Sequence, residues 1–574
     1  MRPLLLVLIV LLCPTAGAEP LADAFERLES WGFSGTVAAG EGEETRLLRG
    51  YGLADREADL AFTPDTRLPW LSLSKPMTGA LALRLEQTGV LALHHELGRY
   101  YPDAPADKAG IRLDQLLSHT SGLAAQLQHP DFSGPPEFEP IDRATLEQRA
   151  LDSQPLKRPG TRFIYSNLGF NLAAAVMEQA SRRAFAELMK EELLLPAGLM
   201  DSQIGGLPVV EEAVGYDGAQ RWGRFSERAW PDGHPGWNLI GAGALIGHTR
   251  DLARIPQLMR GAAPVDPRLA RRWREARISL ANGEDYGLGL SLSEDARGKH
   301  IGHDGGFGPF SAELAWWPRS DEWLVITSNT RHFRAWELRQ ALMTRQAEGK
   351  VAWPPSAPQS PLPTVIAASP RTRWVALHPE GGCWKVSRID DRLEITAYGQ
   401  AATRPLVHDG PAYEESENRG LAVIDRLRAL LHDSAHRPPA KSRRDAAIMY
   451  QLLFQFDERL EGKLTGLDHL ATYPAPDGKL WITELHLRSD EDDATLRIYQ
   501  EADGAWKQLE WTPADPGIRV VLRHVENGVM QGLWIRALRP TATFHVDESG
   551  TIQSGDDWRM PLAVARDTNG LCEG

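Results

Sequence analysis

The stretch Ser72-Leu73-Ser74-Lys75 stands directly before an apolar run, residues 77–87, whose spacing predicts a helix. If Ser72 opens that helix, Lys75 lies one turn along on the same face, and its amine can reach the serine hydroxyl. Arginine stays protonated, whereas a desolvated lysine can lose its proton and act as a base. The stretch therefore predicts a nucleophile beside its base. The alternative is a serine that caps a helix beside a solvated lysine.

Tyr165-Ser166-Asn167 precedes a second apolar run, which predicts a helix over residues 168–190. A cationic lysine near Tyr165 would favour the ionised phenol, which could take the serine proton and later return it to the leaving group. The amide of Asn167 offers a donor and an acceptor to a substrate carbonyl or amide. The alternative is a turn that only caps the helix.

His303-Asp304-Gly305, followed by Gly306, leads into a strand predicted over residues 312–317. On an extended segment His303 and Gly305 face the same side, and the glycine lets a substrate approach the backbone. The next amide, that of Gly306, can point at an oxyanion. The motif is the least specific of the three, because His-x-Gly also occurs at His234, His300 and His408.

The order Ser-x-x-Lys, Tyr-x-Asn, His-x-Gly resembles the serine hydrolases related to class C β-lactamases, penicillin-binding DD-peptidases and family VIII-type carboxylesterases. The resemblance covers about residues 22–335, and it implies an antiparallel sheet flanked by helices and an acyl-enzyme mechanism without metal or organic cofactor. Flanking segments agree with it, namely Arg49-Gly50-Tyr51-Gly52-Leu53-Ala54-Asp55, Thr63-Pro64-Asp65-Thr66, Leu116-Leu117-Ser118-His119-Thr120-Ser121-Gly122-Leu123, Gly241-Ala242-Gly243-Ala244-Leu245 and Asp251-Leu252-Ala253.

Carried over to this sequence, the resemblance implies a role for each matching residue. Ser72 is the expected nucleophile, Lys75 its proton acceptor and Tyr165 the acid/base. Asn167 contacts the substrate amide, and the backbone amides of Ser72 and Gly306 form the oxyanion hole. His119 and Ser121 lie in a family segment that we expect to be structural.

The third motif departs from the pattern of β-lactamases and DD-peptidases, which usually carry Lys-Thr-Gly there. That lysine and threonine help to hold a substrate carboxylate, whereas His303 is titratable and Asp304 is anionic. Similar enzymes with His-x-Gly are carboxylesterases and peptidases acting on D-amino acid or uncharged acyl substrates. His303 and Gly305 are therefore expected to contact an ester, amide or peptide substrate, with a β-lactam or cell-wall peptide as the alternative.

We predict an α+β chain of four parts, in which short strands at both ends of the first domain close one sheet around its helices. Residues 1–18 are a predicted signal peptide, 19–350 the β-lactamase-like domain, 351–372 a proline-rich linker, and 373–574 a second domain. Two helices are predicted in the second domain, over residues 421–431 and 446–455. Alternating runs from residue 480 onward predict an antiparallel barrel or sandwich there.

The N-terminal segment predicts an exported protein, and the net charge limits its partners. The formal net charge of -14 disfavours nucleic acid and anionic membrane partners. The apolar run at residues 4–12 is too short to span a bilayer, which takes about 20 residues, so no membrane anchor is expected after cleavage before Glu19. The expected location is the periplasm or the medium. The oligomeric state and the physiological substrate stay open.

Removal of the signal would leave Cys383 and Cys572 as the only cysteines. A disulfide between them is the prediction, and two unpaired buried thiols are the alternative. Two other functions also stay open, a catalytically inactive binding protein of the same fold and a second domain that binds an apolar ligand or covers the mouth of the active site.

Overall fold

The computed structural model describes residues 18–123 and 141–347, apart from short gaps at 154, 156, 206–210, 231–232, 281–283 and 296. Beyond residue 347 it describes chiefly the helices and strands named below. None of the described helices is both long and apolar enough to cross a membrane. The predicted boundaries at residues 18, 350 and 372 lie at or within undescribed segments and stay predictions.

An antiparallel sheet of eight strands organises the first part of the chain. β1, near the N-terminus, pairs with β15, near residue 325, so the two ends of this part meet in one sheet, as predicted. In spatial order the strands are β10 (Ile278–Ser279), β11 (Asp285–Tyr286), β12 (Ser291–Asp295), β13 (Gly298–Phe307), β14 (Phe310–Trp317), β15 (Glu322–Ser328), β1 (Gly35–Glu41) and β2 (Glu44–Tyr51).

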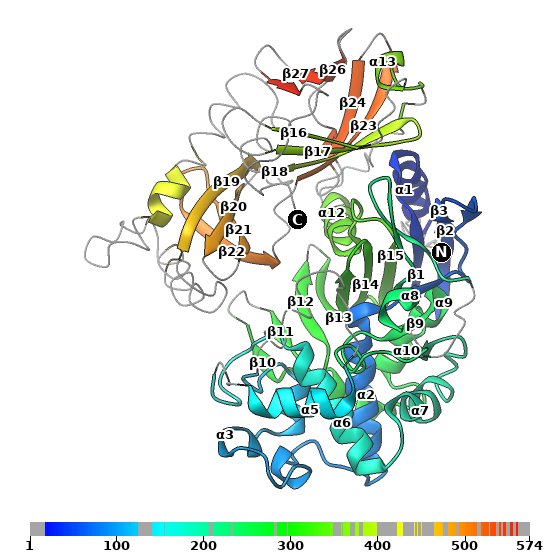
Figure 1. Cartoon of the computed structure of the whole chain (residues 1–574), viewed down its shortest axis with the longest axis vertical. Helices are drawn as coiled ribbons and strands as arrows, with labels where there is room; N and C mark the ends of the chain where they lie inside the picture. Colours follow the sequence, from blue (N-terminus) through cyan, green and yellow to red (C-terminus); the bar gives the residue numbers. More distant parts are fainter. Residues whose placement is uncertain are drawn as a thin grey trace, which may run out of the picture.

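Both faces of this sheet are buried, because alternate side chains of its central strands join different cores. Ala315 and Trp317 of β14 pack with helices α1 (Ala18–Trp31) and α12 (Ala335–Ala347). Leu314 and Trp316 of the same strand pack on the other side, with α2 (Ser74–Gln87) and α6 (Asn167–Ser181). Figure 1 shows α12 and α1 above the sheet and α2 and α6 below it.

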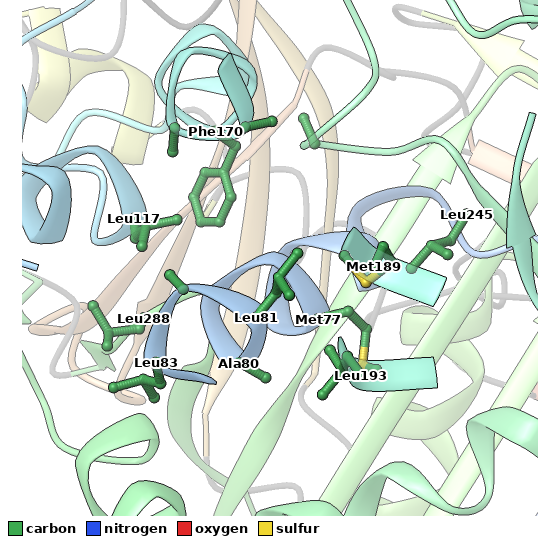
Figure 2. Close-up of a cluster of buried hydrophobic side chains, with 14 of the residues drawn as sticks. Met77, Ala80, Leu81, Leu83, Leu117, Phe170, Met189, Leu193, Leu245 and Leu288 are labelled. Carbon is green, nitrogen blue, oxygen red and sulfur yellow. The ribbon is translucent and has the colours of Figure 1, made fainter. Parts of the chain in front are cut away.

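Helix α2 is the centre of the larger core (Figure 2). Met77, Leu81 and Leu83 are fully buried among side chains of other segments, including Phe170 of α6. The helix begins at Ser74 and its N-cap is Leu73, so the prediction that Ser72 opens it is wrong by two residues. Ser72 instead lies in a 3₁₀ turn, Leu71–Leu73, that enters the helix.

The helix predicted over residues 168–190 is interrupted. α6 ends at Ser181, where Arg182 takes the left-handed φ of 59° and caps the helix. The smaller elements of this part are α3 (Ala106–Ala109), α4 (Leu113–Leu117), α5 (Arg143–Asp152), α7 (Phe185–Leu188), a π-helical turn Met189–Leu194, α8 (Phe225–Ala229), α9 (Thr249–Leu252), α10 (Ile255–Arg260), α11 (Pro267–Trp273), and strands β3 (Leu53–Asp55), β4 (Leu60–Ala61), β5 (Arg67–Pro69), β6 (Gln203–Ile204), β7 (Gly215–Asp217), β8 (Gln220–Gly223) and β9 (Leu245–His248).

The C-terminal part is rich in antiparallel strands, as predicted, and the described strands form two sheets and no closed barrel. One sheet is the consecutive meander β19 (Leu464–Pro474), β20 (Trp481–Ser489), β21 (Asp493–Gln500) and β22 (Trp506–Pro513). The other runs in the order β16 (Arg373–Leu377), β17 (Cys383–Ile389), β18 (Arg392–Tyr398), β23 (Ile518–Glu526), β24 (Val529–Trp534), β26 (Phe544–Val546), β27 (Ile552–Ser554) and β28 (Trp558–Met560), with β25 (Arg539–Pro540) beside β24.

Three predictions for the C-terminal part are tested only in part. Residues 422–428 are helical, within the helix predicted over 421–431, whereas the helix predicted over 446–455 lies almost wholly outside the described residues. Helix α13 (Thr364–Ala367) falls in the predicted linker. Cys383 begins β17, but Cys572 lies outside the described residues, so their disulfide stays a prediction.

Glu394 of β18 anchors the C-terminal part to the first. Its side chain is 1% exposed and lies 3.1 Å from Arg392 and 3.2 Å from Nδ1 of His332, which follows β15. Burial disfavours the ionised form of Glu394. The electrostatic effect of His332, Arg392 and Arg56 outweighs burial and holds the pKa of Glu394 below its ordinary value. The two parts therefore share a buried contact between Glu394 and His332.

We expect Glu394→Ala to lower the free energy of unfolding by about 3–5 kcal/mol, because it leaves buried cationic groups without their counter-charge. Glu501→Ala is the control, since Glu501 forms a surface pair with Lys507 whose loss should cost less than about 1 kcal/mol. Denaturant titration of both variants measures the difference. Equal losses in the two variants would show that the Glu394 contact does not hold the parts together.

Candidate active site

Two side chains converge on one hydroxyl. Lys75 Nζ lies 2.9 Å from Ser72 Oγ, and the Tyr165 hydroxyl lies 3.0 Å from the same oxygen. Tyr165 is distant in sequence and reaches the site because it directly precedes α6, which packs against α2. The structure therefore brings together the three residues predicted to be catalytic.

The Lys75 amine is fully buried, which contradicts the alternative of a solvated lysine. It lies 3.0 Å from the Ala242 carbonyl and 4.8 Å from the centre of the Tyr165 ring. The backbone also packs closely at the start of α2: a β-carbon added at Gly289 would lie 2.4 Å from the Lys75 carbonyl oxygen. Burial lowers the pKa of Lys75 to about 7, although the charge of Asp304 opposes the shift. Near neutral pH a substantial fraction of the amine is therefore uncharged.

Tyr165 behaves differently from the prediction. Burial raises the pKa of its phenol above the ordinary value, and the charge of Asp304 raises it further, although the hydrogen bond with Ser72 opposes the shift. The expected phenolate is thus disfavoured, because the desolvation of the phenol outweighs the attraction of a lysine that is itself losing its charge. The protonated phenol donates a hydrogen bond to Ser72 Oγ, and of the two groups beside this oxygen only Lys75 has a pKa near neutrality.

The ring of His119 packs against the ring of Tyr165. Its ring lies 4.3 Å from the Tyr165 ring, and its Nδ1 accepts the backbone N–H of Ser166 at 2.9 Å. Burial lowers the pKa of His119 well below its ordinary value, so the ring is neutral and Nε2 carries the proton. These contacts are structural, as expected for the segment that contains His119 and Ser121.

Asn171 is a positioning residue that the sequence analysis missed. Its carboxamide accepts the N–H groups of Gly241 and Ala242 at 3.0 and 3.1 Å and donates to the Asn238 carbonyl at 2.7 Å. It thereby holds the loop whose Ala242 carbonyl accepts from Lys75. A signal existed, because Asn171 stands one helical turn after Asn167 within an otherwise apolar run.

His303 points into the same site but does not carry a charge there. Its Nδ1 lies 2.5 Å from the backbone carbonyl of Asp304 and its Nε2 lies 2.9 Å from the Tyr286 hydroxyl, so Nδ1 carries the proton and the tyrosine donates. Burial lowers the pKa of His303 to about 4; the charge of Lys75 also lowers it, while Asp304 opposes the shift. Tyr286 was not predicted, because a lone tyrosine in a two-residue strand carries no recognisable pattern.

The predicted substrate-contacting positions lie around Ser72. A β-carbon added at Gly305 would lie 2.8 Å from the Ser72 backbone nitrogen, so only glycine permits this approach of β13 to the 3₁₀ turn. Leu71 in that turn has a φ of 54°, a strained value for leucine that sets the course of the chain into Ser72. Asn167 is the first residue of α6 and is partly exposed, while Ser166 caps the helix by accepting the Gly169 N–H at 3.0 Å.

Among the described residues, no group of three or more His, Cys, Asp or Glu side chains is placed to hold a metal ion.

Residues 24–347 match the family described as Beta-lactamase. The chain belongs to the beta-lactamase family. Members of this family are serine hydrolases, so the resemblance inferred from the three motifs is confirmed. The matched residues span the eight-stranded sheet and the helices on both of its faces.

Curated relatives match beyond this domain. Penicillin-binding protein 4* of Bacillus subtilis is 27% identical over 409 residues, which cover 66% of this chain and 87% of that protein. A D-aminopeptidase of Brucella ovis is 25% identical over 500 residues, which cover 84% of this chain and 90% of that protein. The octameric penicillin-binding protein homologue from Pyrococcus abyssi has a similar fold, with a TM-score of 0.51 at 15% identity, over 94% of this chain and 98% of that one.

If Lys75 is the base, we expect kcat/KM for an ester substrate to rise with pH up to about 7 and to level above it. Below that pH the amine is protonated and cannot take the Ser72 proton, so the rate should fall about tenfold per pH unit. Initial rates with a p-nitrophenyl ester across about pH 5 to 9, corrected for spontaneous hydrolysis, measure the profile. A rate that does not change through neutrality would contradict the assignment of Lys75 as the base.

Proposed function

We infer that this chain is an exported serine hydrolase that cleaves an ester or amide bond through an acyl intermediate on Ser72. One observation carries the inference: a buried amine and a half-buried phenol both lie within hydrogen-bond distance of one partly exposed serine hydroxyl. Such an arrangement activates a hydroxyl that is otherwise a weak nucleophile.

The proposed reaction begins when neutral Lys75 accepts the Ser72 proton as Oγ attacks the substrate carbonyl. When the tetrahedral intermediate collapses, the proton reaches the leaving group through the phenol of Tyr165, which donates its own proton and regains one from Lys75. An acyl ester remains on Ser72. Water then adds to that ester, its proton returning by the same groups, and the acid is released with Ser72 restored.

The geometry of β13 supports Gly306 as an oxyanion donor. β13 and β14 are joined by a two-residue loop, Gly308-Pro309, and Phe307 pairs with Phe310. Residues that flank such a loop form a hydrogen-bonded pair, so by alternation the Gly306 amide points away from β14. β12 pairs with β13 only as far as Gly302, which leaves this edge of Gly306 unpaired by a described strand. Together, the backbone amides of Gly306 and Ser72 would bind the developing oxyanion.

The substrate preference is proposed from the charges in the site. A neutral His303 provides no cation for a substrate carboxylate, and Asp304 next to it is anionic. Esters and D-aminoacyl peptides are therefore favoured, in agreement with the D-aminopeptidase among the relatives. Asn167 and Gly305 would contact the substrate amide and backbone. The second candidate, a penicillin- or cell-wall-peptide-acting enzyme, is supported by the penicillin-binding protein of Bacillus subtilis.

Export, by the signal peptide predicted at residues 1–18, belongs to the same proposal. No organic cofactor or metal enters the proposed reaction, and nothing in it calls for a nucleic acid partner. N-terminal sequencing of the protein recovered from the culture fluid and from the periplasm tests both the cleavage before Glu19 and the location.

Ser72→Ala should abolish ester turnover and labelling by a fluorophosphonate probe, because the variant lacks the attacking oxygen while the amine and the phenol stay in place. A p-nitrophenyl ester, a D-aminoacyl anilide and nitrocefin, assayed in parallel with the unaltered enzyme, rank the substrate classes. Turnover that survives in Ser72→Ala would exclude the mechanism. A correctly folded but inactive unaltered protein would favour the binding-protein alternative.

Tyr165→Phe should lower kcat/KM by about 10²–10⁴, since it removes the proton donor but keeps the ring that packs on His119. The loss should be larger for an ethyl ester than for a p-nitrophenyl ester of the same acid, because p-nitrophenolate leaves without protonation. Steady-state rates on this substrate pair measure the difference. Equal losses on both esters would assign Tyr165 a role other than donation to the leaving group.

A further inference from the structure

The hairpin of β7 and β8 packs on the loop that follows Gly306, the proposed oxyanion donor. This loop, Gly308-Pro309, joins β13 to β14. A β-carbon added at Gly308 would lie 2.9 Å from the Trp222 ring of β8. One added at Gly215 of β7 would lie 2.5 Å from the Pro309 ring. Each strand of the hairpin therefore contacts one residue of the loop.

The half-buried Trp222 ring is fixed by its neighbours. Its centre lies 6.0 Å from the Phe307 ring and 5.7 Å from the Phe310 ring, both in edge-to-face geometry. The Arg228 guanidinium lies 4.2 Å from the ring centre, and its Nε donates to the Trp222 carbonyl at 2.9 Å. Phe307 directly follows Gly306, so a movement of Trp222 would reach the residue next to the donor amide.

Gly306 needs such support because it lies near the end of the β13–β14 hairpin. β12 pairs with β13 only as far as Gly302, so no described strand holds the outer edge of Gly306. Trp336 of α12 packs on one face of Gly306, and the loop Gly308-Pro309 sets the course of the chain just beyond it. An oxyanion donor is effective only when it is held in place before the reaction. A contact that fixes this loop therefore contributes to the position of the donor.

The opposite end of the β7–β8 hairpin lies against the C-terminal part. Gly218 in its turn is buried, and a β-carbon added there would overlap Oγ of Ser387 in β17. The Gly218 carbonyl accepts from Arg56 at 2.7 Å, and the Arg56 guanidinium lies 4.2 Å from the centre of the Tyr216 ring. Glu394 of β18 lies within electrostatic reach of Arg56. The hairpin thus connects the C-terminal sheet with the loop beside the site.

β7 is fixed at its centre to the segment that follows β15. The Tyr216 N–H donates to the Asn329 carbonyl at 2.9 Å, and the Tyr216 carbonyl accepts from the Arg331 N–H at 3.2 Å. The Asn329 side chain also donates to the Val214 carbonyl at 2.8 Å. A displacement at Gly218 is therefore resisted by β7 and transmitted chiefly along β8, which carries Trp222.

We propose that Trp222 is a positioning residue for the oxyanion hole, and that the C-terminal part supports turnover through the β7–β8 hairpin. The C-terminal sheet holds the turn at Gly218, and Trp222 holds the loop after Gly306. This inference rests on the proposed serine hydrolase activity and deepens it, because it gives the C-terminal part a role in stabilising the transition state.

Trp222→Ala should lower kcat for p-nitrophenyl acetate by about tenfold to a hundredfold, because the donor is misplaced, whereas its removal costs about 10²–10³-fold. KM and the pH midpoint of kcat/KM, which Lys75 sets, should not change. Phenylboronic acid forms a tetrahedral adduct on Ser72 with an oxygen in the oxyanion hole, so its affinity should fall by the same factor as kcat/KM. Trp222→Phe should restore most of both losses.

The link to the C-terminal part is tested at the Gly218 contact with the same small ester, which a mere cover over the site would not exclude. Gly218→Ala places a β-carbon against Ser387 and should also lower kcat. Ser387→Gly alone loosens the contact and should lower kcat by a smaller factor, and it should rescue Gly218→Ala to its own level by making room. Gly218→Ala should add little in the Trp222→Ala background, because the two changes act on one path.

Gly89→Ala is the matched control for backbone strain. Gly89 has a left-handed φ of 77°, as Gly218 has one of 59°, but a β-carbon added at Gly89 meets no atom within 4 Å. It should leave kcat unchanged. Circular dichroism and the thermal midpoint show which variants fold, and Trp222→Leu replaces Trp222→Ala if the latter does not.

The outcomes separate this inference from the proposed function. An unchanged kcat in the Trp222 variant, a loss confined to KM, or a boronate affinity that stays constant while kcat falls overturns the role of Trp222. An unchanged kcat in Gly218→Ala and Ser387→Gly, or no rescue in their combination, overturns the link to the C-terminal part. In either case an inactive Ser72→Ala still supports the serine hydrolase. Turnover that survives in Ser72→Ala overturns the proposed function itself.

Discussion

The burial of one amine is the constraint on which the rest of the structure depends. A lysine in water keeps its proton at neutral pH and cannot serve as a base for a serine. Here the first turn of α2 lies in the main core, and the Lys75 side chain is fully buried there. Desolvating Lys75 lowers the stability of the fold, and strongly perturbed pKa values of this kind cluster at functional sites.

Holding a buried amine in place takes polar partners as well as packing. The Ala242 carbonyl satisfies one of its hydrogens, and Asn171 fixes the loop that carries this carbonyl. His119 positions the phenol without adding a charge, because its Nδ1 accepts a backbone N–H and the ring stays neutral. The polar groups around Ser72 are thus arranged so that only Lys75 changes its charge near neutral pH, which gives the proton a defined route.

The sequence predicts well those features that depend on local pattern. Short apolar runs located β1, β15 and α2, and the three motifs named the residues that meet at Ser72. Predictions that depend on solvent exclusion or on tertiary contacts were less accurate. The ionised Tyr165 was expected from the charge of Lys75, but desolvation of both groups reverses the expectation. Asn171 was missed because its partners lie far away in sequence, and Tyr286 because a lone tyrosine in a two-residue strand carries no pattern. The helix break at Arg182 depends on one residue in a left-handed conformation.

Family membership by itself does not decide the substrate, and the third motif shows why. A fixed lysine at the position of His303 would attract a carboxylate at any physiological pH, whereas buried His303 is neutral across that range. The neighbouring residue, Asp304, is exposed and brings a negative charge to the same strand. One fold can therefore serve substrates of different charge, because specificity lies in the side chains placed on a strand and not in the strand itself. A substitution at Asp304 would also change the pKa of Lys75, because the charge of Asp304 raises it, so the charge of this strand and the basicity of the buried amine are coupled.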